Sequence, residues 1–324
     1  MTDFERLNVL VLAGGLSHER DVSLRSGRRV ADGLAAHGHR VTVREPDSSL
    51  LAAIRDLDPD VVWPALHGAS GENGALRALL TTAGIPFVGA DAEAARLAWL
   101  KPVAKTVVAR AGVQTPASVT LPTETFRELG AVSVLEALGD ALTAPLVVKP
   151  AEGGSAQGVT FVDDIADLPR ALVNAYTYNE VALIERRVTG IEVAVTVLDT
   201  GAGPVALPAV EIVPRNGVYG FEARYNAGET SFFTPARLTV AATDRVAEAA
   251  IAAHEALGLR HLSRVDLIVD PDGQPWFLEA NVLPGLTETS LVPLAIEAAG
   301  FDLGAVYAGL AEQAIRDGLA LAGQ

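Results

Sequence analysis

The sequence predicts an α/β protein of two or three domains, and three observations support this prediction. Its 324 residues exceed the usual ~100–200 residues of a single domain. Hydrophobic residues make up 49% and charged residues 20%, an ordinary globular balance with enough apolar material for buried cores. Strand-like and helix-like patterns alternate along the first part of the chain, which favours a mostly parallel sheet covered by helices.

Composition excludes several classes of function. The 25 Lys+Arg against 40 Asp+Glu give a net charge of −15, whereas nucleic-acid binders and proteins held on anionic lipid need basic surface. Cysteine is absent, which excludes disulfides, thiol nucleophiles and thiolate-bound metals. The start MTDFERLNVL does not have the pattern of a secretory signal, and no apolar run approaches the ~20 residues that cross a bilayer. We therefore expect a soluble, cytoplasmic protein without a membrane or nucleic-acid partner.

Residues 1–98 are predicted to form one α/β domain. We expect, in order, a strand at Leu7–Leu12, a helix through Val30 and Leu34 that ends at Gly38, a strand at Arg40–Arg44, a helix at Leu50–Leu57, a strand at Val61–Leu66, a helix at Gly74–Ala83 and a short strand at Ile85–Val88. The pair Gly14-Gly15 favours a tight turn after the first strand, and Gly38 is placed to end the first helix.

The rest of the chain divides into residues 99–188 and residues 189–324. In the former we expect a helix at Pro102–Ala111, a connector at Gln114–Pro122, a helical region around Leu129–Leu142, strands at Pro145–Lys149 and Val159–Asp163, a helix at Leu168–Tyr178 and a strand at Val181–Arg187. In the latter we expect strands at Ile191–Leu198 and Val205–Val213, an irregular stretch at Arg215–Pro235, a helix at Val240–Leu257, strands at Arg264–Val269 and Pro275–Asn281, and a helical C-terminus. An aperiodic stretch as long as the irregular one is typical of a functional or mobile loop.

The last two predicted strands place acidic and amide side chains together. A hairpin with the loop Pro271–Gln274 puts Asp266 opposite Glu279 and Arg264 opposite Asn281, all on one face, because residues two apart along a strand share a face. Opposed carboxylates repel each other, whereas a divalent cation attracts both. Asp, Glu and Asn oxygens are the hard ligands that Mg²⁺ prefers. We therefore expect a metal site here rather than a solvated acidic face.

Three further segments hold candidate binding residues, each with a structural alternative. The glycine-rich loop from Lys149 to Gly158 suits phosphate, because glycines let backbone N–H groups approach a ligand; a flexible hairpin loop is the alternative. Glu19 follows the first strand and either holds a substrate ammonium or is an acid at a helix N-terminus. His67 follows another strand and is either a ligand contact or a hydrogen-bonded loop histidine. Neither GxxxxGK[ST] nor GxGxxG is present, which argues against a P-loop ATPase and a nicotinamide dehydrogenase.

Taken together, these segments resemble the D-alanine–D-alanine ligases of the ATP-grasp superfamily. The resemblance covers nearly the whole chain in order, through GGLSHERDVSLRSG, LHGASGENG, AGVQTP, VVKPAEGGSAQG, FEARYNAGETSFFTPA, SRVDLIV and FLEANVLPGLTETSLVP. It implies a Rossmann-like N-terminal substrate domain (1–98). A central (99–188) and a C-terminal (189–324) ATP-grasp subdomain, α+β in character, would follow and sandwich the nucleotide.

The resemblance implies that the chain uses ATP with two Mg²⁺ ions, for which Mn²⁺ is a substitute. It assigns Asp266, Glu279 and Asn281 to the metal. The residues that it places at the nucleotide are Lys101 and Lys149 at the phosphates, Glu185, Arg186 and Val188 in the adenine segment, Glu192 at the ribose, and Arg224 where the family commonly has lysine.

The resemblance also implies two D-alanine sites and a homodimer. It places Glu19 at the first ammonium with His67 nearby, Arg264, Gly285 and Ser290 at the acyl group and the second carboxylate, Leu291 beside them, and Ser155 and Tyr225 with Glu19 in a hydrogen-bonded set that helps close a loop over the site. ATP would convert the first D-alanine to an acyl phosphate, and the amine of the second would attack it while Arg264 stabilises the oxyanion. The product, D-alanyl-D-alanine, serves peptidoglycan precursor synthesis, and the irregular stretch would be a lid that excludes water.

Several positions depart from the family pattern. Val282-Leu283 stands where Thr or Ser usually follows the metal-binding Asn, Ala156 interrupts the commoner GSSxG, Gly153 replaces a frequent Glu, and Asn73 replaces the Asp of GEDG. The departures at Val282 and Ala156 motivate one alternative, a related ATP-grasp ligase with another acceptor such as D-serine, D-lactate or a different amino acid. A non-catalytic nucleotide-binding regulator is the other alternative, against which the retained carboxylates, Arg264 and both lysines argue.

Overall fold

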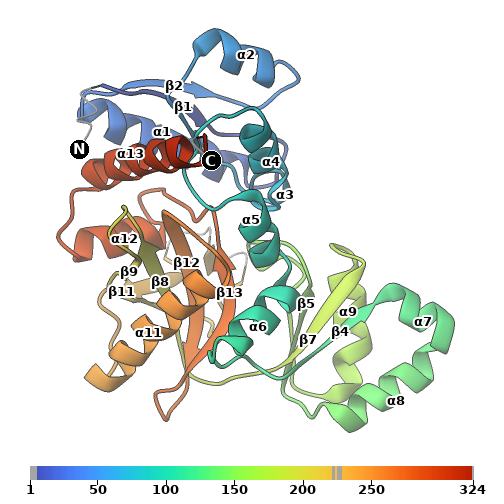
Figure 1. The fold of residues 1–324 in the computed structure, drawn as a ribbon. Coiled ribbons are helices and arrows are strands. Elements are labelled where there is room, and N and C mark those ends of the chain that lie inside the picture. Colours follow the sequence, from blue (N-terminus) through green and yellow to red (C-terminus); the bar gives the residue numbers. More distant parts are fainter. Residues whose placement is uncertain (1–5, 221–222, 225–227, 323–324) are drawn as a thin grey trace.

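Three β-sheets of three, four and six strands, each with its own helices, organise the described part of the chain in the computed structural model (Figure 1). The structure describes residues 6–220, 223–224 and 228–322. The α/β class agrees with the prediction. We call the sheets N-terminal, central and C-terminal, in the order in which the chain enters them.

The N-terminal sheet is parallel. Its segment of the chain comprises β1 (Asn8–Leu12), α1 (Arg20–Ala36), β2 (Arg40–Arg44), α2 (Leu50–Leu57), β3 (Val61–Pro64), α3 (Ala69–Glu72), α4 (Ala75–Thr82) and α5 (Ala92–Trp99). Strand β1 lies in the middle, between β2 and β3. The strand predicted at Ile85–Val88 is wrong, because only Phe87 forms a bridge, to Val62. Pro86 has no N–H to donate to a ladder, and the segment is too short to pair around it.

The central sheet is antiparallel, with the strand order β4-β7-β5-β6. Its segment comprises α6 (Lys101–Arg110), β4 (Ser118–Pro122), α7 (Thr123–Leu129), α8 (Ala131–Ala141), β5 (Leu146–Pro150), β6 (Thr160–Val162), a 3₁₀ turn (Ile165–Asp167), α9 (Leu168–Tyr176) and β7 (Val181–Arg186). The predicted connector Gln114–Pro122 therefore ends in a strand. Strand β4 lies at the edge of the sheet, where a proline is tolerated.

The C-terminal sheet has the order β11-β10-β8-β12-β13, with β9 also beside β8. Its segment comprises β8 (Ile191–Leu198), β9 (Val205–Ala206), β10 (Val210–Pro214), β11 (Thr230–Phe233), α11 (Val240–Ala256), β12 (Leu262–Val269), β13 (Pro275–Asn281), α12 (Leu291–Ala298) and α13 (Leu303–Ala322). The strand predicted at Val205–Val213 is thus two strands. The stretch predicted as irregular contains β11, which pairs with β10.

The acidic end of the β12–β13 hairpin has the register that the sequence predicts, but the loop and the pairing next to the loop differ from the prediction. Arg264 pairs with Asn281 and Asp266 pairs with Glu279. Farther along, Val269 pairs with Pro275, so the loop is one residue longer than predicted. A β-bulge beyond Asp266 adds one residue to β13 and restores the alignment at the acidic end.

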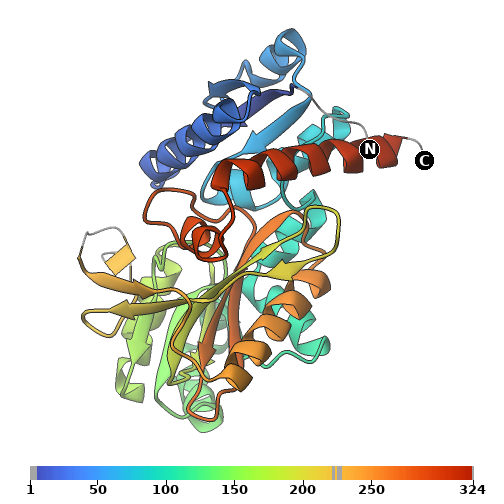
Figure 2. The same cartoon turned by 90° about the vertical axis from the view of Figure 1, so that its left-hand side faces the viewer.

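Packing does not follow the linear order of the three segments. Buried residues of α5 and α6 share a core cluster with the α11 face of the C-terminal sheet. Helix α13, although last in the chain, lies alongside α1 in Figure 2 and contacts β3 as well. There Tyr307 meets Trp63 edge-on, with ring centroids 5.3 Å apart. The last helix thus completes the core beside the N-terminal sheet.

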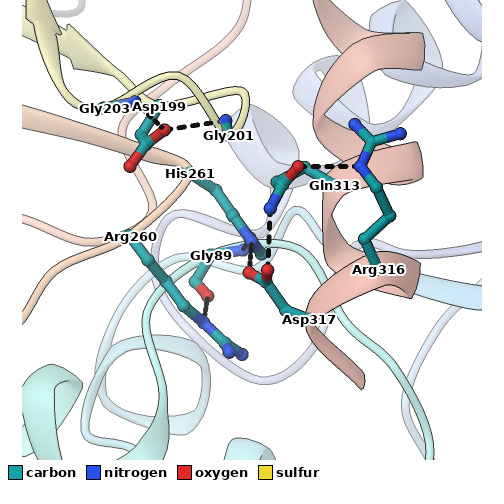
Figure 3. Close-up of polar contacts among 9 residues, drawn as sticks. All are labelled: Gly89, Asp199, Gly201, Gly203, Arg260, His261, Gln313, Arg316 and Asp317. Carbon is teal, nitrogen blue, oxygen red and sulfur yellow. Dashed lines mark hydrogen bonds and ion pairs between the residues drawn. The ribbon is translucent and has the colours of Figure 1, made fainter. Parts of the chain in front are cut away.

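A polar clamp joins the N-terminal segment to the loop before β12 and to α13 (Figure 3). Both sides of Gly89, which has a φ of +102°, are held: its N–H donates to His261 Nδ1 (2.9 Å) and its carbonyl accepts from Arg260 Nε (2.8 Å). His261 Nε2 in turn lies 2.8 Å from Asp317 on α13. The clamp fixes the point where the chain leaves the first sheet.

Among the described residues, no single helix combines the length and apolar character needed to cross a membrane. One bent pair, Leu291–Ala298 with Leu303–Leu319, meets those two criteria together, with an angle of 105° between its helices.

Candidate active site

The larger of two adjoining cavities, about 950 Å³ in volume, lies between the central and C-terminal sheets. Strands β5 and β7 line it from one side, and β8, β12 and β13 line it from the other. A cavity of this size can hold a nucleotide-sized ligand. The predicted nucleotide and metal residues that line it are Lys101, Lys149, Glu185, Arg186, Val188, Glu192, Arg224, Asp266 and Glu279.

Lys101 connects the glycine-rich loop to the acidic hairpin. As the first residue of α6, it donates from Nζ to the carbonyl of Gly153 (2.7 Å) and lies 2.9 Å from Glu279 Oε2. Burial alone raises the pKa of Glu279, but the nearby charges of Lys101, Arg224 and Lys149 lower it below its ordinary value. Glu279 therefore stays ionised beside a lysine that faces the cavity.

Lys149 is held by Glu185 on the neighbouring strand. Val147 pairs with Glu185, so Lys149, two residues farther along β5, shares its face of the central sheet. Lys149 Nζ lies 2.6 Å from Glu185 Oε2, and the other carboxylate oxygen contacts Lys105 of α6. The sequence analysis missed Lys105, and its place four residues after Lys101 was the only available signal.

The acidic hairpin is tightly connected on its polar face. Arg264 donates to both oxygens of Asp266, from Nε at 2.7 Å and from an Nη at 2.8 Å, and Asn281 Nδ2 lies 3.2 Å from Asp266 Oδ2. Burial lowers the pKa of Arg264, but the adjacent Asp266 charge raises it above its ordinary value. The prediction that these side chains share one face is confirmed by these contacts.

The hairpin oxygens fit Mg²⁺ only if the metal takes further ligands. The described residues gather no group of three His, Cys, Asp or Glu side chains suited to a metal. Asp266 and Glu279 supply two carboxylates, and Asn281 adds an amide oxygen. Mg²⁺ commonly binds one or two carboxylates and completes its octahedron with water and substrate phosphates. The donor set therefore suits a metal bound together with a nucleotide.

Glu192 on β8 carries a perturbed carboxyl group in the larger cavity. Burial raises its pKa to about 7, Asp266 adds to the rise, and the positive charge of Arg224 opposes it. The Arg224 guanidinium also stacks 4.3 Å from the ring centroid of Tyr219. Tyr219 and Arg224 line the second cavity as well, so they lie where the two cavities meet.

The second, smaller cavity has a volume of about 630 Å³ and lies against the N-terminal domain. The predicted residues that line it are Glu19, His67, Ser155, Arg224, Arg264, Asn281, Gly285, Ser290 and Leu291. Ser155 donates its hydroxyl hydrogen bond to Glu19, which joins the glycine-rich loop to the N-terminal domain. Tyr225, the third member of the predicted set, lies outside the described residues.

His67 uses both ring nitrogens in contacts with its own chain. Nδ1 lies 3.1 Å from the carbonyl of Leu283, which can only accept, so Nδ1 carries the proton. Nε2 lies 3.4 Å from Ser26 Oγ, and that hydroxyl accepts the N–H of Leu286 (3.1 Å). Burial lowers the pKa of His67, which favours this neutral form. Ser26 and His67 thereby hold the loop after β13, and Ser26 was missed by the sequence analysis.

That loop leads directly into the predicted acceptor residues. Gly285 lies so close to Ser290 that an added Cβ would be 2.8 Å from its hydroxyl oxygen, so a larger residue there would require the Ser290 side chain to move. Ser290 Oγ also contacts Thr287, at 3.0 Å from its backbone N and 2.8 Å from its Oγ1. Leu291 follows as the first residue of α12. The loop after β13 thus brings the predicted acceptor residues to the smaller cavity.

Two sheets that face each other across a lysine-bearing cavity, with an acidic hairpin at one end, define an ATP-grasp protein. Residues 107–312 match the family model described as "D-ala D-ala ligase C-terminus". The chain belongs to the D-alanine–D-alanine ligase family.

Relatives match along nearly the whole chain. It is 41% identical over 297 residues to a D-alanine–D-alanine ligase of Gloeobacter violaceus, covering 91% of this chain and 95% of that one. It is 42% identical over 313 residues to a D-alanine–D-alanine ligase of Anaeromyxobacter sp. strain Fw109-5, covering 97% of each.

Solved structures of the same fold include enzymes with different acceptors. The VanG D-Ala:D-Ser ligase from Enterococcus faecalis superposes with a TM-score of 0.81 at 26% identity, over 95% of this chain and 99% of that one. The D-alanine–D-alanine ligase from Bacillus anthracis complexed with ATP superposes with a TM-score of 0.78 at 26% identity, over 97% and 99%.

Proposed function

We propose that this chain joins two D-alanines to D-alanyl-D-alanine at the expense of ATP, for peptidoglycan precursor synthesis. The observation that carries the proposal is the pair of adjoining cavities. The larger one suits a nucleotide, and the smaller one is lined by a carboxylate, Glu19, and a guanidinium, Arg264, which complement an amino acid. Membership of the ligase family supports the same reaction.

The charges of the larger cavity support the use of ATP together with Mg²⁺. Among the residues that the structure describes, five cationic side chains line it: Lys101, Lys149, Arg186, Arg187 and Arg224. Seven carboxylates accompany them: Glu152, Asp163, Glu185, Glu192, Glu229, Asp266 and Glu279. A polyphosphate bound without a metal would add negative charge to a lining that is already acidic on balance. Mg²⁺ held by the hairpin oxygens would neutralise charge on the transferring phosphoryl group when bound.

The chain's own residues would position the reactants. Glu19 would hold the ammonium of the first D-alanine. The carboxylate of that D-alanine would then point toward the hairpin and the larger cavity. Lys101 and Lys149 would hold the nucleotide phosphates as point charges. Attack by the D-alanine carboxylate on the terminal phosphorus would form an acyl phosphate and release ADP, a transfer that depends mainly on positioning and electrostatics.

The second step is amide formation in the smaller cavity. The amine of the second D-alanine attacks the acyl carbon, phosphate leaves, and the amine loses a proton. Arg264 would face the oxyanion that develops on the acyl oxygen, where a fixed positive charge is most effective. Gly285 and Ser290 would receive the second carboxylate, with Leu291 against its methyl group.

We extend the proposal to the assembly and its setting. The resemblance to the family supports a homodimer, for which light scattering would give twice the 33.7 kDa mass of the chain. Because ATP is supplied in the cytoplasm, the reaction would take place there.

The test is phosphate release from ATP and Mg²⁺ with D-alanine alone, and with D-alanine plus D-serine or D-lactate, followed by mass analysis of the products. We expect release with D-alanine alone and D-alanyl-D-alanine as the product. A product formed only with another acceptor would show a changed specificity, which the Val282-Leu283 departure motivates. Nucleotide binding without turnover would instead favour a regulator.

A further inference from the structure

Three buried side chains from three different elements meet at one wall of the larger cavity. They are Lys105 of α6, Glu185 of β7 and Lys149 of β5, and we call them the Lys–Glu–Lys triad. Lys105 is 4% exposed, Glu185 2% and Lys149 8%. Glu185 and Lys149 line the cavity, whereas Lys105 does not. Lys105 therefore acts on a ligand only through the other two.

Both carboxylate oxygens of Glu185 contact a lysine of the triad. One oxygen of Glu185 contacts Lys105 Nζ, and the other lies 2.6 Å from Lys149 Nζ. Lys105 Nζ also donates to the carbonyl of Pro116 (2.8 Å), which fixes it from a second direction. Burial alone raises the pKa of Glu185, but Lys149 and Lys105 lower it below its ordinary value. Glu185 is therefore an ionised carboxylate shared by two ammonium groups.

The charge balance of the triad explains why it contains two lysines. One carboxylate and two ammonium groups leave a single net positive charge, and Lys149 presents that charge to the cavity. If Lys105 were neutral, Glu185 and Lys149 would cancel each other. A buried pair of this kind attracts an anion weakly, because the lysine is already neutralised at close range in a medium of low dielectric constant.

We propose that Lys105 is a positioning residue for nucleotide binding, which balances Glu185 so that the charge of Lys149 remains available to the phosphates. The proposal rests on the proposed function, since it takes the larger cavity as the nucleotide site. It also gives Glu185, which the resemblance places in the adenine segment, a further role in holding Lys149. Because α6 packs on the C-terminal sheet, Lys105 also connects that sheet to the wall of the central one.

The test compares ADP with adenosine, which lacks the phosphates, by calorimetric titration of the full chain. In Lys105→Met we expect the Kd of ADP to rise roughly 10- to 100-fold, the size of loss seen when a residue that supports a metal ligand from behind is removed. The Kd of adenosine should stay close to that of the unmodified chain. Lys105→Arg, which keeps the charge, should restore most of the ADP affinity.

Two further variants separate charge balance from damage to the fold. Removing Lys105 and Glu185 together takes away one positive and one negative charge, so Lys149 again leaves the wall with one net positive charge. Lys105→Met combined with Glu185→Gln should therefore recover the ratio of ADP to adenosine affinity, even if Lys105→Met alone does not fold. Arg237→Met removes a cation from the partly exposed pair with Glu211, outside both cavities, and should leave the ratio unchanged.

The outcomes distinguish this proposal from the proposed function. Normal ADP affinity in Lys105→Met, or an equal loss for ADP and adenosine, would overturn the proposed role of Lys105. A double variant whose affinity ratio stays low would do the same. The proposed function would be unaffected by any of these results. If the unmodified chain binds neither ADP nor adenosine, the nucleotide site itself is wrong, and both proposals fall together.

Discussion

Glu72 offers a sharp test of the electrostatics around the smaller cavity. It is the last residue of α3, it is 9% exposed, and its Oε1 accepts the backbone N–H of Gly68 (2.8 Å). Burial raises its pKa from 4.5 to about 8, the nearby charge of Glu19 adds to the rise, and the Gly68 hydrogen bond opposes it. Glu72→Gln keeps the shape and the acceptor oxygen but removes the titration.

The magnitude and its sign follow from linkage. Between pH 4.5 and about 8 the folded chain keeps a proton on Glu72 that the unfolded chain has released, so the free energy of unfolding falls as the pH rises. The pKa difference of about 3.5, at about 1.36 kcal/mol for each unit, makes this loss about 5 kcal/mol, complete above pH 8. Glu72→Gln escapes the loss and should be the more stable protein at high pH.

Calorimetric melting at pH 5 and pH 9 measures this effect. We expect Glu72→Gln to melt near the unmodified chain at pH 5 and on the order of 10 °C above it at pH 9. Glu128→Gln, at an exposed position of α7, controls for the loss of a carboxylate and should show no such divergence. Equal melting differences at the two pH values would refute the assignment of a protonated Glu72.

Three other predictions concern the loop, the C-terminal helix and the metal. Ser26→Ala removes the acceptor for the N–H of Leu286, so the KM for the second D-alanine should rise about tenfold in initial-rate measurements, with the KM for ATP unchanged; an unchanged acceptor KM would contradict it. The buried hydroxyl of Tyr307 has no hydrogen-bond partner among the described residues, so Tyr307→Phe should keep or raise the Tm, by the equivalent of about 1 kcal/mol, and a fall in Tm would count against this. Glu279→Gln should raise the Mg²⁺ concentration for half-maximal turnover while circular dichroism stays unchanged; an unaltered Mg²⁺ dependence would exclude it as a ligand.

The acidic hairpin could be predicted from sequence because its signal is local. Alternation in β12 and β13 distinguishes the apolar face from the polar one, and the turn residues place the two strands in sequence. The register of Asp266 opposite Glu279 followed from a loop that is in fact one residue longer, and the bulge compensated for the difference. Burial of one face fixed the register more strongly than the loop did, because a slip by one residue would expose every apolar side chain.

Elements that depend on distant partners could not be predicted in this way. Strand β4 contains Thr and Pro residues that are typical of a connector. The segment forms a strand because it pairs with β7. Helix α13 gives no sign in its own sequence that it packs on α1 at the other end of the chain. The role of Lys105 could not be predicted for the same reason, because its partner Glu185 lies 80 positions away in the sequence.

The resemblance assigned roles to single residues, and the structure adds that several of the charged ones already have a partner within the chain. Asp266 is already bound by Arg264, Glu279 by Lys101, and Glu19 accepts from Ser155. A metal or a substrate ammonium must therefore share or displace a partner that belongs to the chain. The net binding free energy of such a ligand is smaller than its Coulomb attraction to the carboxylate, because the loss of the existing contact offsets part of that attraction. Binding then favours a ligand that also engages the displaced cation, as a nucleotide phosphate would engage Lys101 when Mg²⁺ takes Glu279. Metal and nucleotide should accordingly bind better together than either does alone.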